Sequence, residues 1–169
     1  MKLWKQFLGI SILCLCLMGC DFLAKEDTAL FYYLRTPDTY LYGESDAVIF
    51  PEQRDCSGKI NNLHYLLTLY LEGPLDPAYV SPFPTGTGIV SLEISGTSVS
   101  IELSEEFASL SGMDRTLAGA CLARTCFALH NAYQVHIYTQ TQNNETVSLT
   151  LTRDDRIFMD GIPGTTPTQ

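Results

Sequence analysis

The sequence is poor in basic residues and contains few groups that commonly perform chemistry. Of its 169 residues, 10 are Lys or Arg and 19 are Asp or Glu, which gives a formal charge of −9. Phosphate binding and attraction to anionic lipid both need a basic face. The composition therefore argues against nucleic acid as a partner and against a purely electrostatic contact with a membrane. With 46% apolar residues, a chain of this length predicts one globular domain.

The histidines and cysteines offer no persuasive metal site. The histidines are His64, His130 and His136. Cys126 and His130 stand four residues apart on an expected helix and could both face a metal, but a structural zinc needs four ligands and no second pair has a suitable spacing. A core thiol beside a histidine at a helix end is the favoured interpretation. No metal and no cofactor are expected.

Two adjacent carboxyl groups, Glu105 and Glu106, are the other candidates for chemistry. Adjacent positions of a helix face different directions, so these side chains are poorly placed to act together as acid and base. Because they follow Ser104, they instead suit the first turn of a helix, where carboxylates interact favourably with the helix dipole. The sequence contains no catalytic constellation, and we predict a protein that is not an enzyme.

The N-terminal residues have the pattern of a bacterial lipoprotein signal peptide. Lys2 and Lys5 precede an uncharged run over residues 7–18, which is too short to span a membrane comfortably. The run ends in Leu-Met-Gly before Cys20, which resembles the lipobox. On that resemblance residues 1–19 are removed, and Cys20 carries palmitate and further acyl chains. An uncleaved anchor or an ordinary secretory signal is the alternative.

Acylation of Cys20 would hold the mature chain at the extracytoplasmic face of the cell membrane. Each buried CH₂ group contributes about 0.8 kcal/mol, so two or three acyl chains suffice as an anchor. Loss of residues 1–19 leaves 150 residues with 8 basic and 19 acidic side chains, and hence a charge of −11. Cys56, Cys121 and Cys126 then remain, without a Cys-x-x-Cys pair. One disulfide with a spare thiol and three buried free thiols both fit this number.

The first half of the mature chain predicts a tether, two short strands and a helix. Residues 20–28 form the lipidated tether, and residues 29–34 and 47–50 form strands, the second closed by Pro51. Apolar residues at helical spacing predict a helix over 59–72, with Ser57 as its N-cap. The Gly-Pro pair that follows this helix is a typical stop.

Strict alternation predicts a β-hairpin in the middle of the chain. Val90, Leu92 and Ile94 share one apolar face, and after a turn at residues 96–97 the same pattern continues through residues 99–103. A slip of one residue would expose this whole apolar face, so the register is well specified.

A second helix and a second hairpin complete the predicted domain. Ser111 and Asp114 form a capping-box pattern that opens a helix extending to about Asn131, and Gly119 lies among small residues that permit close docking. Valine and leucine alternate in two further strands, at residues 135–137 and 147–151. The order β-β-α-β-β-α-β-β predicts an α+β two-layer sandwich, with two helices on one face of an antiparallel or mixed sheet.

The predicted domain therefore spans residues 29–152, and residues 153–169 are expected to form a mobile C-terminal tail. Tyr40 and Tyr42 lie in a turn-rich loop after the first strand. Tyrosine provides a large contact area at a small entropic cost, so these two residues are candidates for an interaction surface.

Several short motifs occur in an order that resembles the GerM-type (GerMN) domain of sporulation and spore germination lipoproteins. The helix over 59–72 ends in Leu-x-Gly-Pro, a Pro-x-Gly-Thr turn follows, and the second strand of the hairpin leads into Leu-Ser-x-x-Phe. The residues that carry the resemblance are Leu71, Gly73, Pro74, Pro84, Gly86, Thr87, Leu103, Ser104 and Phe107.

The resemblance implies a non-catalytic domain related in shape to the ring-building modules of secretion and sporulation assemblies. It implies a lipid-anchored protein that acts through contacts with envelope or sporulation proteins. An oligomer of this chain is one arrangement that the resemblance allows. A lipoprotein that binds a small ligand or a cell-wall fragment is the alternative. A deep pocket at Tyr40, Tyr42 and residues 82–88 would favour that alternative, and a shallow surface would not.

Overall fold

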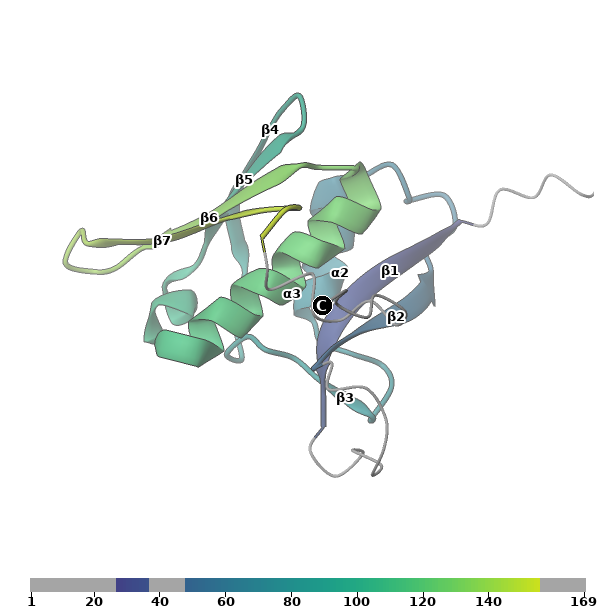
Figure 1. The fold of residues 1–169 in the computed structure, drawn as a ribbon, viewed down its shortest axis with the longest axis horizontal. Helices are drawn as coiled ribbons and strands as arrows, with labels where there is room; N and C mark the ends of the chain where they lie inside the picture. The colour runs from purple at the N-terminus through teal and green to yellow at the C-terminus, as the bar shows by residue number, and fades with distance from the viewer. Residues whose placement is uncertain (1–26, 37–47, 156–169) are drawn as a thin grey trace, which may run out of the picture.

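A computed structural model describes residues 27–36 and 48–155 of the chain (Figure 1). Its elements are β1 (Thr28–Arg35), β2 (Ile49–Asp55), α2 (Leu63–Leu71), β3 (Tyr79–Val80), β4 (Ile89–Ser95), β5 (Ser98–Leu103), the 3-10 helix η2 (Glu105–Ser109), α3 (Gly112–His130), β6 (Gln134–Gln140) and β7 (Thr146–Thr152). The predicted signal peptide, Cys20, Tyr40, Tyr42 and most of the predicted tail lie outside the described residues. Within those residues, no helix combines the length and hydropathy needed to cross a membrane.

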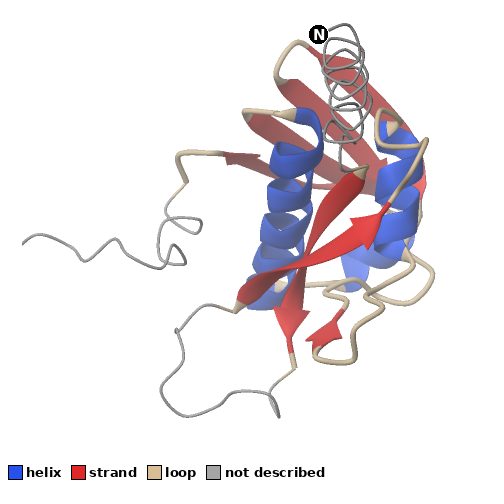
Figure 2. Ribbon diagram, turned by 90° about the vertical axis from the view of Figure 1, so that its right-hand side faces the viewer, coloured by secondary structure: helices blue, strands red, loops and turns tan. Residues whose placement is uncertain are grey.

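The predicted α+β two-layer arrangement is confirmed. Strands β4, β5, β6 and β7 form a sheet in that order, in which β5 and β6 are parallel and the other pairs are antiparallel. Helices α2 and α3 lie on one face of this sheet, and β1 and β2 lie on the opposite side of the helices (Figure 2). The strands are divided into two sheets instead of one, because β1 pairs with β2 and briefly with β3.

The edge of β1 is closed by side chains of the helices. The Tyr32 N–H donates to Thr125 Oγ1 of α3 at 3.0 Å, and the Tyr70 hydroxyl of α2 donates to the Tyr32 carbonyl at 2.9 Å. Thr125 is fully buried and its hydroxyl donates to the Cys121 carbonyl at 2.9 Å. Both backbone groups of Tyr32 are thus satisfied without another strand, which explains why β1 does not join the four-stranded sheet.

Strand β2 is longer than expected and does not stop at Pro51. It continues to Asp55, with Pro51 opposite Tyr32 of β1. Since the Tyr32 backbone groups bond to the helices, this pair exchanges no ladder hydrogen bond, and the missing N–H of Pro51 faces outward. An edge strand tolerates proline at such a position.

The predicted start of the first helix is wrong. Helix α2 begins at Leu63, and the Asn62 side chain caps it by accepting from the Tyr65 N–H at 3.0 Å. Ser57 instead lies in a turn, where its N–H donates to the Asp55 carboxylate at 2.9 Å. Ser57 and Asn62 are both favourable N-caps, and turns between them occupy the residues that helical spacing assigned to the helix.

The second helix begins where the capping-box pattern predicts, but without the side-chain bond of that motif. Ser111 is the N-cap residue of α3 and has an extended backbone, yet its hydroxyl accepts no hydrogen bond from the helix. The small residues of α3 do permit close docking. A Cβ atom on Gly119 would lie 2.1 Å from Cδ2 of Leu149 in β7.

The hairpin β4–β5 has the predicted turn, with one change in the apolar face. Leu92 lies opposite Ile101 and Ile94 opposite Val99, as the alternation requires. A bulge between Ile89 and Ser91 leaves Val90 outside this pattern, so that 61% of Val90 is exposed. A bulge adds a residue to one strand only, and simple alternation cannot reveal it.

We expect Thr125→Val to destabilise the domain, because valine keeps the shape of threonine but leaves the buried Tyr32 N–H without an acceptor. A lost acceptor of this kind costs about 1–3 kcal/mol. Urea unfolding followed by circular dichroism would measure the change. Thr116→Val is the matched control, since Thr116 also bonds back along α3, to Gly112, but holds no strand. Equal effects of the two substitutions would contradict the role given to Thr125.

Candidate functional site

A buried ion pair on β2 underlies the candidate site. Glu52 and Arg54 are 7% and 6% exposed, and Arg54 Nε donates to Glu52 Oε2 at 2.6 Å. They are two residues apart on a strand, so both side chains lie on the same face. The guanidinium lies over the ring of Phe31, 5.0 Å from its centroid. Charge, hydrogen bonds and an aromatic surface together compensate for the burial of Arg54.

Arg54 holds the C-terminal end of α2. Its Nη2 atom donates to the Gly73 carbonyl at 2.5 Å and to the Tyr33 hydroxyl at 3.0 Å. The Tyr33 hydroxyl in turn donates to the Tyr70 carbonyl at 2.8 Å. The last carbonyl groups of a helix have no partner within the helix. Here Arg54 supplies hydrogen-bond donors at the end of α2, directly to the Gly73 carbonyl and through the Tyr33 hydroxyl to the Tyr70 carbonyl.

Glu52 holds the chain just beyond that helix. Its Oε1 atom accepts from the backbone N–H groups of Leu75 and Asp76 at 2.8 and 2.7 Å. Between the two anchored points, Gly73 has a φ of +100°, which favours glycine, and Pro74 follows it. The Leu-x-Gly-Pro motif therefore marks a chain reversal that the ion pair fixes.

A series of aromatic contacts connects this reversal to the following loop. The Tyr33 and Tyr70 rings stack with centroids 4.8 Å apart, Tyr70 meets Phe83 at 5.9 Å, and Phe83 meets Phe107 of η2 at 6.2 Å. Burial raises the pKa of the Tyr33 and Tyr70 hydroxyls, so both remain protonated hydrogen-bond donors. The motif residue Phe107 thus packs against the same loop as the motif at the end of α2.

The loop over residues 84–88 is held from within and from β5. The Thr87 hydroxyl donates to the Pro84 carbonyl at 2.8 Å, and Gly86 has a φ of +92°. Gly88 N–H donates to Ser104 Oγ at 2.9 Å, and Ser104 N–H donates back to the Gly88 carbonyl at 2.9 Å. These bonds at Pro84, Thr87 and Gly88 fix the shape of the loop, which forms one wall of the site.

This loop and the end of α2 enclose an open groove with a volume of 390 Å³. Its walls are formed by Thr68, Leu71, Glu72, Ser81, Phe83 and residues 84–89. Four residues of the GerMN-like motifs therefore line it directly: Leu71, Pro84, Gly86 and Thr87. Motifs that are separated along the sequence converge on one surface feature, which we take as the candidate functional site.

Glu105 and Glu106 lie in the first turn of η2, as expected, and do not face one another as an acid/base pair. Glu105 accepts from the Gln142 side chain at 3.1 Å. Hydrogen bonds from the Ser104 hydroxyl and from its own backbone N–H hold the pKa of Glu106 below its ordinary value. The Glu106 side chain lies about 4.0 Å from where a Cβ of Gly86 would be, so it supports the loop from below.

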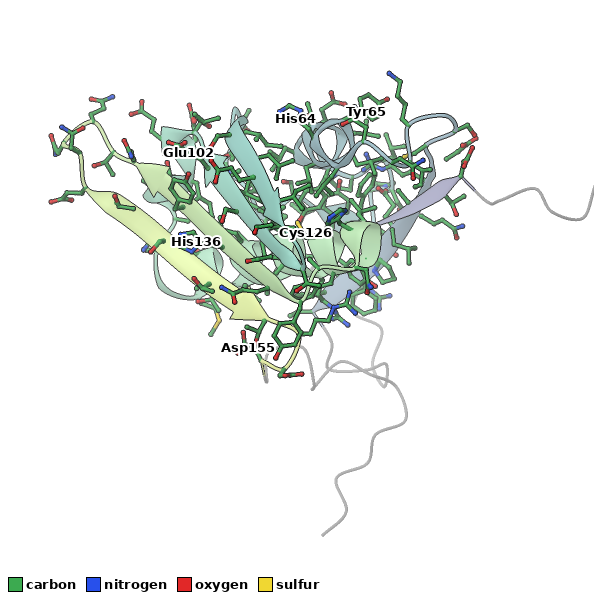
Figure 3. All side chains as sticks on the ribbon, turned by 90° about the horizontal axis from the view of Figure 1, so that it is seen from above. His64, Tyr65, Glu102, Cys126, His136 and Asp155 are labelled. Atoms are coloured by element: carbon green, nitrogen blue, oxygen red, sulfur yellow. The ribbon has the colours of Figure 1, made fainter. Side chains whose placement is uncertain are left out.

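The three cysteines of the described chain are free and buried. Burial raises the pKa of Cys121 to about 12 and that of Cys126 further, so neither is a reactive thiolate. Cys126 points into the interior (Figure 3). His130, the last residue of α3, is exposed. Among residues 27–36 and 48–155, no three His, Cys, Asp or Glu side chains are grouped to hold a metal.

The sequence analysis missed Glu52 and Arg54, which organise the site. The available signal was weak: two opposite charges at alternate positions of a strand share a face and can pair there. Pro51 hides this signal, because a proline at this position predicts the end of the strand. Cys20, Tyr40 and Tyr42 lie outside the described residues, so their predicted roles stay predictions.

No protein-family model and no curated protein matches the sequence. Among solved structures, the tandem GerMN domains of the sporulation protein GerM from Bacillus subtilis match with a TM-score of 0.51 and 13% identity over 80% of this chain. The present chain covers 48% of that structure, about half its length. A protein from Clostridium perfringens assigned as a lipoprotein matches with a TM-score of 0.46 and 18% identity, over 76% of this chain and 88% of that one.

The likeness to the tandem domains establishes the fold. At 13% identity it concerns the fold alone, so the chain has a GerMN-type fold, as the motif order predicted.

We expect Arg54→Met to destabilise the domain by about 3–5 kcal/mol, because it leaves the Glu52 carboxylate buried without its partner. The double variant with Glu52→Gln should lose less stability than the sum of the two single variants. Chemical denaturation of all three variants would measure this coupling. Gln53→Met, on the exposed face of the same strand, is the control. Strictly additive losses would show that the two charges do not depend on each other.

Proposed function

We propose that this chain is a lipid-anchored extracytoplasmic interaction domain that supports sporulation, germination or assembly of the cell envelope. The observation that carries the proposal is the GerMN-type fold, shared with two domains of a sporulation protein. The resemblance of residues 17–20 to a lipobox supports the location, and the groove lined by residues of the GerMN-like motifs is the contact surface that we propose.

The hydrogen bonds in the wall of the groove suit the binding of a partner better than catalysis. Its wall over residues 84–88 uses its hydroxyl and backbone groups to hold its own shape, with Thr87 bonded to Pro84 and Gly88 bonded to Ser104. Catalysis needs polar groups aimed at a reacting atom. A rigid wall of this kind instead offers a fixed shape, which lowers the entropic cost of binding a partner.

The anchor would keep this surface near the bilayer. Strand β1 begins at Thr28, eight residues after Cys20. Eight extended residues span at most about 26–29 Å, so the domain would stay close to the membrane surface. Its acidic character disfavours contact with anionic lipid, which leaves the domain available to a protein.

The test is a host in which the gene is deleted and then complemented with variants. We expect the deletion to lower the yield of heat-resistant spores or to delay germination, and wild-type protein to restore both. Cys20→Ser should lose palmitate incorporation and leave the membrane fraction, because the acyl chains are the anchor. It should therefore fail to complement.

Cys56→Ala is the matched control, since it removes another thiol without placing a hydroxyl in the core, and it should remain in the membrane fraction and complement the deletion. Unchanged sporulation, germination and envelope in the deletion strain would refute the proposed role. Retention of Cys20→Ser in the membrane, with undiminished palmitate label, would refute the lipid anchor independently.

Capture of a small ligand or cell-wall fragment is the second candidate, favoured by the groove volume of 390 Å³. Small-molecule sites commonly enclose 300–1,000 Å³. A purified disaccharide-peptide fragment of the cell wall should then raise the melting temperature as its concentration rises. Thr68→Trp, at an exposed position of α2 that lines the groove, should abolish that rise by filling the groove. A melting temperature that does not respond would remove this candidate.

A further inference from the structure

The outer edge of β4 carries backbone groups that no described strand uses. β4 is the terminal strand of the four-stranded sheet, and Figure 1 shows its turn projecting beyond the body of the domain. The two-residue turn makes Ser95 and Ser98 a hydrogen-bonded pair, as expected with Gly96 at a φ of +59°. Alternation then directs the N–H and C=O groups of Leu92 and Ile94 away from β5, toward the open edge.

The same edge exposes apolar side chains and adjoins the groove. Val90 and Ile94 are 61% and 46% exposed. Ile89, the first residue of β4, is itself part of the groove wall. An exposed edge strand with apolar side chains readily pairs with another extended segment unless it is protected by charge, proline or a covering element.

The opposite edge of the sheet differs in its side chains and is occupied at one end. On β7, the backbone N–H of Thr152 donates to the Asp155 carboxylate at 2.6 Å, so one of the groups that face outward is already occupied. The remaining edge positions of β7 carry the polar, exposed Thr146, Ser148 and Thr150. The two edges of one sheet therefore differ, and β4 is the one that combines open backbone groups with exposed apolar side chains.

The stretch of chain that contains β4 carries charged side chains of a single sign. Residues 60–114 contain no Lys or Arg and seven Asp or Glu. This stretch builds α2, the groove, β4, β5 and η2. Glu72 lines the groove, and Glu93 projects from the outer face of β4 beside Glu102 of β5, which accepts from Ser91. A partner that approaches this edge meets carboxylates and no competing cation from the same stretch.

We propose that the β4 edge binds an extended segment of a partner protein in which apolar and basic side chains alternate. The segment adds a strand to the sheet through the backbone groups of Leu92 and Ile94. Because alternate side chains of a strand face opposite sides, its apolar residues lie beside Leu92 and Ile94 while its basic residues lie beside Glu93. The proposal rests on the proposed function and names the chemistry of its partner.

A second copy of this chain fits the edge less well. Antiparallel pairing of two β4 strands would bring the Glu93 side chains of both copies, together with Glu102, onto one face of the joined sheet. Like charges on facing strands are destabilising. The chain also has a formal charge of −9, so two copies repel one another in general.

The test uses the full chain purified in detergent and a labelled synthetic peptide, four Val-Lys repeats, followed by fluorescence anisotropy at physiological salt. We expect saturable binding, with at least tenfold weaker binding of four Val-Glu repeats. Ile94→Pro should weaken binding of the Val-Lys peptide at least tenfold, because proline removes the outward N–H. Ser148→Pro, at the corresponding position of β7, should change it less than twofold.

A Val-Lys peptide with N-methyl groups on alternate amides tests strand addition without changing the protein. This test remains available if Ile94→Pro does not fold. When the methyl groups are on the amides that would face β4, the peptide should bind at least tenfold more weakly than the unmodified peptide. Equal binding of the methylated and unmodified peptides, or equal effects of the two proline variants, would overturn strand addition. Concentration-dependent dimers in sedimentation that Ile94→Pro abolishes would overturn it in favour of a second copy.

The outcome is separable from that of the proposed function. If the deletion strain is defective while no peptide pairs with β4, the strand-addition proposal alone fails. If peptides bind as expected while the deletion strain is indistinguishable from the wild type, the proposed role fails and the binding edge stands.

Discussion

The buried pair of Glu52 and Arg54 fixes the end of α2, and the wall of the groove that α2 forms depends on it. Two charges removed from water are costly, and the cost is offset only if each finds several partners. Here the partners are backbone groups on either side of Gly73, where α2 ends and the chain reverses. The opposite wall of the groove is held separately, by the bonds between Gly88 and Ser104, and the Phe83 ring connects the two walls through Tyr70.

The elements that the sequence predicted well are those whose information is local. Alternation identified β4, β5, β6 and β7, and helical spacing identified most of α2 and α3. The predictions are wrong where hydrogen-bond partners distant in the sequence determine how far an element extends. Pro51 stays within β2 only because Tyr32 bonds to Thr125, 93 residues further on. No local pattern around Pro51 contains that information.

For the candidate site, too, the sequence predicted the local features and not the contacts between distant residues. Their order was sufficient to predict a GerMN-type fold, and Gly73 and Gly86 occupy positive-φ positions where glycine is favoured. The sequence did not reveal that Ser104 ties the loop to β5, or that these motifs enclose a groove. The motif residues therefore act mainly by shaping a surface, which accounts for their spacing better than direct chemistry does.

The distribution of charged residues along the chain says more about the partner than the net charge does. The basic residues that stabilise the core are engaged: Arg54 with Glu52, Arg124 over the Tyr32 ring, and Arg153 with the Ala132 carbonyl. The stretch that forms the groove and the β4 edge contains none at all. Because charges are screened beyond roughly 8–10 Å, this local imbalance, more than the net charge, governs which segment can pair with β4. Selection by charge then acts on the same few residues whose backbone groups are open to pairing.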